Sequence, residues 1–270
     1  MKVRVIFACE SFTLGNPGER ISPEFYKLAR ELTESRGAYL AVDSVQAGFR
    51  VRGVLSITDY PGFESLPPPD FESFSKALNG GQYPLSVLAL SERAAKWHRP
   101  GIYGNTMTGN PRACDVASSV LESITPELRK NINSIGEFAL RTFSELQKEY
   151  PTCIEKVTGS GLLYAVHLFE DMFSVTEDQP ESKGGYPCAE KWLRMNGIGV
   201  IHGGDNALRF TPNFKFSEKE ILLQAEVLKK YFNSYIGVAI YHSKNLRKDI
   251  ICNDVSSTCY SSNSSPIVKD

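Results

Sequence analysis

The stretch Phe71-Glu-Ser-Phe-Ser-Lys-Ala-Leu-Asn-Gly-Gly81 decides the interpretation of this chain. Its first half is strand-like, and its two glycines turn the chain into a loop. Glycine lets a backbone approach a ligand closely, because no Cβ stands in the way. Lys76 lies where the strand gives way to this loop. Most lysines are only solvated, but this position makes Lys76 the first candidate for a functional side chain.

A second apolar run, Ala38-Tyr-Leu-Ala-Val-Asp43, ends in an acid. A lone Asp at a strand end is most often a cap or a turn residue. An acid and an amine that follow two buried strands also suit a cationic ring lying between them. Pyridoxal phosphate (PLP) has an aldehyde for a lysine and a ring nitrogen for an acid. We therefore expect PLP between Asp43 and Lys76, with Lys76 buried beside the ring.

Bulk composition indicates a globular protein. The 270 residues are 41% hydrophobic and 23% charged, which is ordinary for a folded chain. The net charge of -1 gives no electrostatic reason to expect nucleic acid or an anionic membrane as a partner. No apolar run approaches the roughly 20 residues of a membrane span. The six cysteines and four histidines are dispersed, so we expect no metal site.

Strand-like and helix-like segments alternate in the first half of the chain. We expect strands at 3–9, 38–43, 71–75 and 85–90, with a helix from Pro23 to about Arg36 that Ser22 caps and Gly37 ends. The first two strands should be parallel, since a helix separates them. The fold class is α/β. We assign residues 1–110 to an incomplete large domain with a mostly parallel sheet.

The second half has a different pattern. Asn110-Pro111 opens helices that run to about Tyr150, with an interruption near Thr125-Pro126. We interpret residues 111–150 as connecting helices and 151–233 as a small C-terminal α+β domain. Its last helix starts at a capping box, in which Ser217 pairs with Glu220. Residues 234–270 form a divergent tail for which disorder is one interpretation.

Four motifs, in order, resemble the class-III, ornithine-type aminotransferases, which are PLP enzymes of fold type I. They are Asp43-Ser-Val-Gln46, Ser75-Lys-Ala-Leu78, Gly109-Asn-Pro111 and Leu208-Arg209. The resemblance runs from about residue 3 to residue 232. It implies amino-group transfer between an amino acid, such as ornithine or acetylornithine, and a 2-oxo acid.

The resemblance also implies roles on the cofactor side. Asp43 matches the partner of the pyridine nitrogen, and Val45 matches the apolar residue packed on the ring. Gln46 matches the side chain that reaches the phenolic oxygen, and Lys76 matches the Schiff-base lysine. Thr106 matches the threonine that binds the cofactor phosphate across the interface of a homodimer.

On the substrate side, Arg209 matches the arginine that holds a substrate carboxylate. A guanidinium suits bidentate carboxylate binding, although an ordinary surface ion pair is the alternative from the residue type alone. One departure stands out, because the acid that usually follows the pyridine-binding Asp is Ser44 here.

Family members also carry a long segment before the equivalent of Val3. That segment supplies a phosphate-binding turn, a stacking aromatic residue and further strands, so we expect an open sheet edge and no activity from this chain alone. The alternatives are a non-catalytic remnant that binds a partner, or another class-III reaction by a racemase, aminomutase or decarboxylase. We expect a cytoplasmic protein, or a mitochondrial one if a preceding segment carries a transit peptide.

Overall fold

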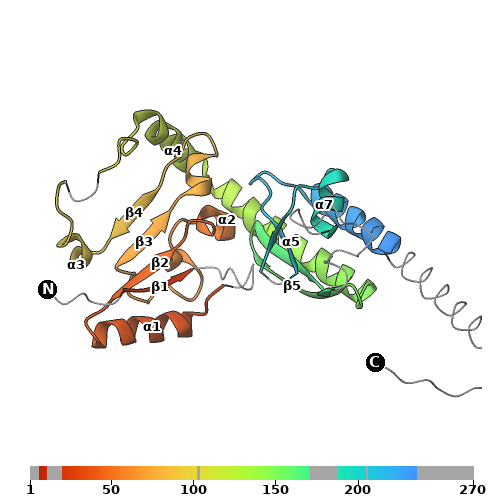
Figure 1. The fold of residues 1–270 in the computed structure, drawn as a ribbon, viewed down its shortest axis with the longest axis horizontal. Coiled ribbons are helices and arrows are strands. Elements are labelled where there is room, and N and C mark those ends of the chain that lie inside the picture. The colour runs from red at the N-terminus through yellow and green to blue at the C-terminus, as the bar shows by residue number, and fades with distance from the viewer. Residues whose placement is uncertain (1–5, 11–19, 102–103, 171–187, 205, 236–270) are drawn as a thin grey trace, which may run out of the picture.

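The computed structural model describes residues 6–10, 20–101, 104–170, 188–204 and 206–235. Two four-stranded sheets organise this part of the chain (Figure 1). The first sheet lies in the N-terminal half, and the second lies in the C-terminal half. Helices α4 (Pro111–Ser123) and α5 (Pro126–Glu149) come between them in the sequence. We refer to the two halves as the first unit and the second unit. The predicted tail falls, from residue 236 onward, outside the described residues.

The first sheet has the order β1-β2-β3-β4. Its strands are β1 (Ile6–Glu10), β2 (Tyr39–Asp43), β3 (Phe71–Phe74) and β4 (Val87–Leu90). The pairs β1/β2 and β2/β3 are parallel, and β3/β4 is antiparallel. The α/β class and the mostly parallel sheet are therefore confirmed. In a parallel arrangement the carboxyl ends of the strands meet at one edge of the sheet, which is where ligands commonly bind in such folds.

Helix α1 (Pro23–Ser35) begins where the sequence predicts. The Ser22 hydroxyl accepts a hydrogen bond from the Phe25 amide at 3.1 Å, and Pro23 occupies the first turn. After the helix, Gly37 takes the left-handed conformation with φ 61°. The helix packs against the sheet through its buried face, which includes Tyr26. This crossover helix makes the parallel pairing of β1 and β2 possible.

Short elements complete the first unit. They are α2 (Gly48–Arg52), η1 (Ile57–Asp59), η2 (Lys76–Asn79) and α3 (Glu92–Ala95). The Pro-rich stretch around residues 59–70 is otherwise without regular structure, as predicted. The predicted loop after β3 begins with the single turn η2, so Lys76 starts a short 3₁₀ helix.

Asp70 anchors the start of β3 although it is fully buried. Its carboxylate accepts hydrogen bonds from Arg30, Arg93, Ser91 and the Leu40 amide. Burial alone would raise the pKa of this carboxyl, but the donors outweigh it and lower the pKa to about 2. This network ties α1, β2 and α3 to β3.

The second unit is built on an antiparallel sheet of order β5-β6-β8-β7. The strands are β5 (Ile154–Ser160), β6 (Leu163–Leu168), β7 (Ile201–Gly203) and β8 (Ala207–Phe210). Helix α5, helix α7 (Cys188–Met195) and a helix over 218–235 pack on this sheet. The last helix runs four residues beyond its predicted end at Tyr231. One half of the predicted Ser217–Glu220 capping box is present, because Glu220 accepts from the Ser217 amide at 2.8 Å. The Ser217 hydroxyl also donates to Glu220 at 2.8 Å, and the Glu220 amide donates to the Ser217 carbonyl instead of to the hydroxyl.

The two units touch through α2 and the turn between β5 and β6. Leu162 donates its amide to the Arg50 carbonyl at 2.9 Å. The Arg50 side chain is stretched across the same contact and donates to the Pro212 carbonyl at 2.5 Å. Burial lowers the pKa of this guanidinium to about 10, so it still carries its charge at neutral pH. The contact brings residues of the second unit beside the first sheet.

Strand β4 is exposed along its whole length. Leu88 is 57% exposed and Val87 is 43% exposed. An edge strand with apolar side chains and unpaired backbone groups is a surface that proteins usually cover. The expected open edge is therefore present in the described residues. No helix in those residues is long and apolar enough to cross a membrane.

Candidate active site

Three strand ends meet at the carboxyl edge of the first sheet. Glu10 of β1 pairs with Asp43 of β2, and Asp43 pairs with Ser73 of β3. Lys76 follows Ser73 by three residues. The acid and the amine predicted from sequence therefore lie at adjacent ends of two parallel strands.

Asp43 is held in place by its neighbours. Its Oδ1 atom accepts hydrogen bonds from the Val45 amide at 2.9 Å and from the Ser73 hydroxyl at 3.2 Å. The residue is exposed, so its carboxylate keeps access to a ligand. Sequence analysis missed Ser73, but the register of two parallel strands could have placed it opposite Asp43.

Lys76 has a strained backbone, with φ 44°. Non-glycine residues seldom adopt this conformation, which costs of order 1–3 kcal/mol and concentrates at functional sites. The preceding Ser75 is fixed by its hydroxyl, which donates to the Leu85 carbonyl at 2.5 Å. Two left-handed glycines follow, Gly80 with φ 58° and Gly81 with φ 72°. The side chain is exposed, so the expectation that Lys76 is buried is wrong for this chain, in which protein atoms leave the amine accessible.

Gln46 and Arg209 are brought together from distant parts of the sequence. The Arg209 guanidinium donates to the Gln46 side-chain oxygen at 2.9 Å, across a separation of 163 residues. Arg209 lies on β8, and its guanidinium packs against the backbone of Gly203 on β7. A Cβ added at Gly203 would lie 3.1 Å from Arg209 Cζ. Arg209 therefore reaches from the second unit to the segment that follows Asp43.

Val45 and Thr106 have different surroundings. Val45 is partly buried between Ser44 and Gln46, in the segment that carries Asp43. Thr106 lies in an exposed turn between α3 and α4. The turn is shaped by Asn105, whose side chain accepts from the Met107 amide at 2.8 Å. Asp43, Gln46, Lys76 and Arg209 thus gather around one edge of the sheet, while Thr106 remains a prediction from resemblance.

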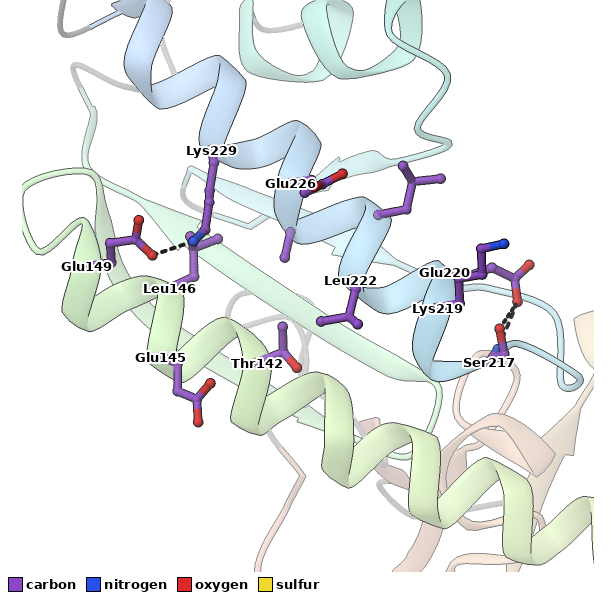
Figure 2. A pocket seen from close by; sticks show the side chains of 12 residues that line it. Thr142, Glu145, Leu146, Glu149, Ser217, Lys219, Glu220, Leu222, Glu226 and Lys229 are labelled. Carbon is purple, nitrogen blue, oxygen red and sulfur yellow. Dashed lines mark hydrogen bonds and ion pairs between the residues drawn. The ribbon is translucent and has the colours of Figure 1, made fainter.

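A separate open cavity of about 880 Å³ lies in the second unit, between α5 and the helix over 218–235 (Figure 2). Leucine side chains and charged residues line it, and Lys229 contacts Glu149 across it at 2.5 Å. None of the predicted site residues lines this cavity. Its ion pair is largely exposed, and such pairs contribute little. The predicted site residues lie elsewhere, at the carboxyl ends of the first sheet's strands and on β8.

Comparison with known proteins agrees with the motifs. The family model for class-III aminotransferases matches residues 10–232. The chain is 32% identical over 200 residues to an acetylornithine aminotransferase of Clostridium acetobutylicum, covering 73% of this chain and 46% of that protein. It is 30% identical over 220 residues to ornithine aminotransferase 2 of Staphylococcus saprophyticus, covering 81% of this chain and 50% of that protein. The chain spans about half the length of these relatives.

A solved structure of an ornithine aminotransferase from Toxoplasma gondii shares the fold, with a TM-score of 0.67 and 25% identity. The similarity covers 86% of this chain and 51% of that one, whose active site holds PLP at partial occupancy. The chain belongs to the class-III aminotransferase family. The predicted family and fold are thereby confirmed.

Proposed function

We propose that this chain forms part of a PLP-dependent aminotransferase, in which an amino group passes between an amino acid and a 2-oxo acid. One observation carries the proposal: Asp43 and Lys76 lie at adjacent ends of two parallel strands, and Lys76 has a strained backbone. An exposed amine and a carboxylate fixed by two donors match the two ends of PLP that need partners. The described residues therefore fit the aldehyde and the ring nitrogen of the cofactor.

PLP, when bound, withdraws electrons from the substrate carbon that gains or loses the amino group. Asp43 would keep a proton on the ring nitrogen, because a carboxylate stabilises the charged form. The Val45 amide and Ser73 hydroxyl hold Asp43 for this role. Lys76 would bind the cofactor covalently through Nζ. When the substrate amine takes over this bond, Lys76 is released, and its free amine would carry the proton to and from the substrate carbon.

Arg209 would bind the substrate carboxylate. It now donates to the neutral Gln46 amide at 2.9 Å, and a carboxylate is a stronger acceptor that can take two parallel hydrogen bonds. Substrate binding can therefore replace the Gln46 amide with the substrate carboxylate, which is the stronger acceptor for Arg209. Gln46 would then be available to the phenolic oxygen of the cofactor, and Val45 would pack on the ring.

The names of the relatives suggest the substrate class, since they are ornithine and acetylornithine aminotransferases. We propose an amino donor of that kind and a 2-oxo acid acceptor. In a homodimer, Thr106 would bind the cofactor phosphate of the partner subunit, which agrees with its exposed turn. The domain boundaries at 110, 150 and 233, and a cytoplasmic location, remain predictions from sequence.

The direct test is an amino-transfer assay with ornithine and 2-oxoglutarate, on the protein isolated at its natural length. We expect turnover that Lys76→Ala abolishes and that Lys130→Ala, at an exposed helical lysine, leaves unchanged. Racemisation or decarboxylation without amino transfer would contradict the proposal. For residues 1–270 alone we expect no turnover, because they span about half of each relative.

Asp43→Asn gives a finer test of the same proposal. An amide cannot stabilise the protonated ring nitrogen as a carboxylate does, and losing one such electrostatic contact commonly costs about 10²–10³-fold in kcat. We expect the variant to bind PLP while kcat falls by that factor. If kcat stayed within a few-fold of the unsubstituted enzyme, Asp43 would not be the partner of the ring.

A further inference from the structure

Glu72 is a buried acid beneath the candidate site. It lies on β3, and the whole residue is only 4% exposed. Three donors meet its carboxylate: the Ser44 hydroxyl at 2.6 Å, the Ser56 hydroxyl at 2.7 Å and the Ile57 amide at 2.9 Å. Burial raises the pKa of this carboxyl, and the three donors oppose the shift. A buried acid is costly unless it is hydrogen-bonded, and these three donors make the burial of Glu72 tolerable.

Ser44 connects this acid to the site. It follows Asp43 directly and is 1% exposed. Its amide donates to the Ser73 carbonyl at 3.0 Å, while its hydroxyl donates to Glu72. Asp43 lies on one side of Ser44, and Val45, whose amide donates to Asp43, lies on the other. Fixing the Ser44 side chain therefore fixes the peptide groups that aim the Asp43 carboxylate.

The arrangement also accounts for the departure noted in the sequence. The resemblance noted in the sequence implies an acid at the position of Ser44, directly after Asp43. Here a hydroxyl stands at that position, and the acid lies on the neighbouring strand at Glu72. The two side chains meet at 2.6 Å. The residue after Asp43 is thus still bound to a carboxylate. That carboxylate belongs to the neighbouring strand.

We propose that Glu72 is a positioning residue, which acts through Ser44 to hold the segment 43–46 in the geometry that the cofactor and Arg209 require. Glu72 binds no substrate in this account. Ser56 and Ile57, in the segment after α2, also donate to Glu72 and hold its carboxylate in place. The functional meaning of this role rests on the proposed aminotransferase activity, but the mechanical role can be tested without PLP.

The test is amide hydrogen exchange on the 270-residue chain, measured at one amide just after β2 and at one within it. The Val45 amide donates to Asp43 at the carboxyl end of β2. The Leu40 amide donates to Asp70 near the amino end of β2. Loosening of the 43–46 segment should speed exchange at Val45 only, whereas general destabilisation of the unit should speed both.

We expect Ser44→Ala to speed exchange at Val45 by about tenfold, as the loss of a hydrogen bond to a charged group would allow, with Leu40 unchanged. Glu72→Gln keeps the shape and loses the charge, so we expect a smaller acceleration at Val45. Glu127→Gln, at a fully exposed acid on α5, is the matched control and should change neither amide.

The double variant Ser44→Ala with Glu72→Gln decides whether the two residues act together. If Glu72 acts through Ser44, the double variant should exchange at Val45 no faster than Ser44→Ala alone. Equal acceleration at Val45 and Leu40, additive effects in the double variant, or no change at Val45 would each overturn the proposal. Because no outcome depends on PLP, failure here is distinguishable from failure of the proposed activity.

Discussion

The cores of the two units differ in their chemistry. The second unit closes one apolar cluster around its sheet, with Phe143, Tyr164 and Phe210 in mutual ring contact. Among the described residues, the first unit buries two acids, Asp70 and Glu72, where the second buries one, Glu190, and only the first leaves a strand, β4, exposed along its whole length. The unit with the more polar interior is also the one that carries Asp43 and Lys76.

This difference indicates that the two units are stabilised in different ways. An apolar core needs no particular partners beyond good packing, while a buried acid is stable only when specific donors surround it. Such donors fix backbone positions, and a site built on strand ends needs fixed backbone. The second unit contributes Arg209 to the candidate site from β8, a strand of its packed sheet.

The largest effect should come from the core of the second unit. Phe143→Ala removes a fully buried ring that contacts Tyr164 and Phe210, and we expect a loss of about 4 kcal/mol in the free energy of unfolding. Denaturant unfolding monitored by exchange of the β6 amides measures it. Phe25→Ala, at a ring that is 43% exposed, is the control. A loss below about 1 kcal/mol would mean that this core is not closely packed.

Asp70→Asn should have the next largest effect, in the first unit. Removing one member of a buried ion pair typically costs 3–5 kcal/mol, and because Arg93 is partly exposed we expect about 3 kcal/mol. Exchange of the Leu40 amide and thermal unfolding measure the loss. Asp115→Asn, at an exposed acid on α4, is the matched control and should change stability by less than about 0.5 kcal/mol.

The same residue predicts a pH dependence. The pKa of Asp70 is lowered in the folded state from 3.8 to about 2, so the folded state favours the ionised carboxylate. Its stabilisation is fully present above pH 3.8 and is lost as the pH falls toward 2. The unsubstituted protein and Asp70→Asn should therefore converge in stability across that window. Curves that stay parallel there would contradict the assignment.

Gly161→Ala tests the contact between the units. Gly161 has φ 57°, and an added Cβ would lie 2.1 Å from the Val51 carbonyl oxygen, so backbone must shift. Overpacking of this kind costs about 1–3 kcal/mol. We also expect weaker protection of the Leu162 amide, which donates to Arg50. Gly197→Ala has a positive φ but no atom near its Cβ, and it controls for backbone strain alone.

The smallest effect should come from the exposed strand. Leu88 on β4 is 57% exposed, so Leu88→Ser should change stability by no more than about 0.5 kcal/mol. It should also reduce self-association of the isolated chain, since it removes apolar surface from an open edge. Sedimentation at several concentrations measures this. A loss of several kcal/mol would show that β4 is packed against other residues.

Local signals in the sequence predicted many of the elements. Ser22-Pro23 and Asn110-Pro111 mark helix starts because their side chains and ring geometry satisfy the first turn, and both helices begin there. Thr125-Pro126 likewise marks the break between α4 and α5. The parallel pairing of β1 with β2 followed from the intervening helix. These features depend on neighbouring residues only, so a single sequence contains them.

Long-range features could not be found in the same way. The contact between Gln46 and Arg209 joins residues 163 positions apart, and only the assembled sheets bring them together. The exposure of Lys76 and its strained φ depend on how β3 meets η2. The Ser44–Glu72 hydrogen bond was equally hidden, since Glu72 lies on another strand and looks like an ordinary surface acid in a strand-like run.

The central claim is that Lys76 is the covalent partner of PLP, and reduction followed by peptide mapping tests it most directly. The protein at its natural length would be treated with borohydride and then digested. Borohydride reduces the bond between the lysine and the cofactor to a stable single bond that survives digestion. The account predicts a pyridoxyl group on the peptide that contains Lys76, and its loss in Lys76→Ala. A pyridoxyl group found only on another lysine, such as Lys130 or Lys148, would contradict it.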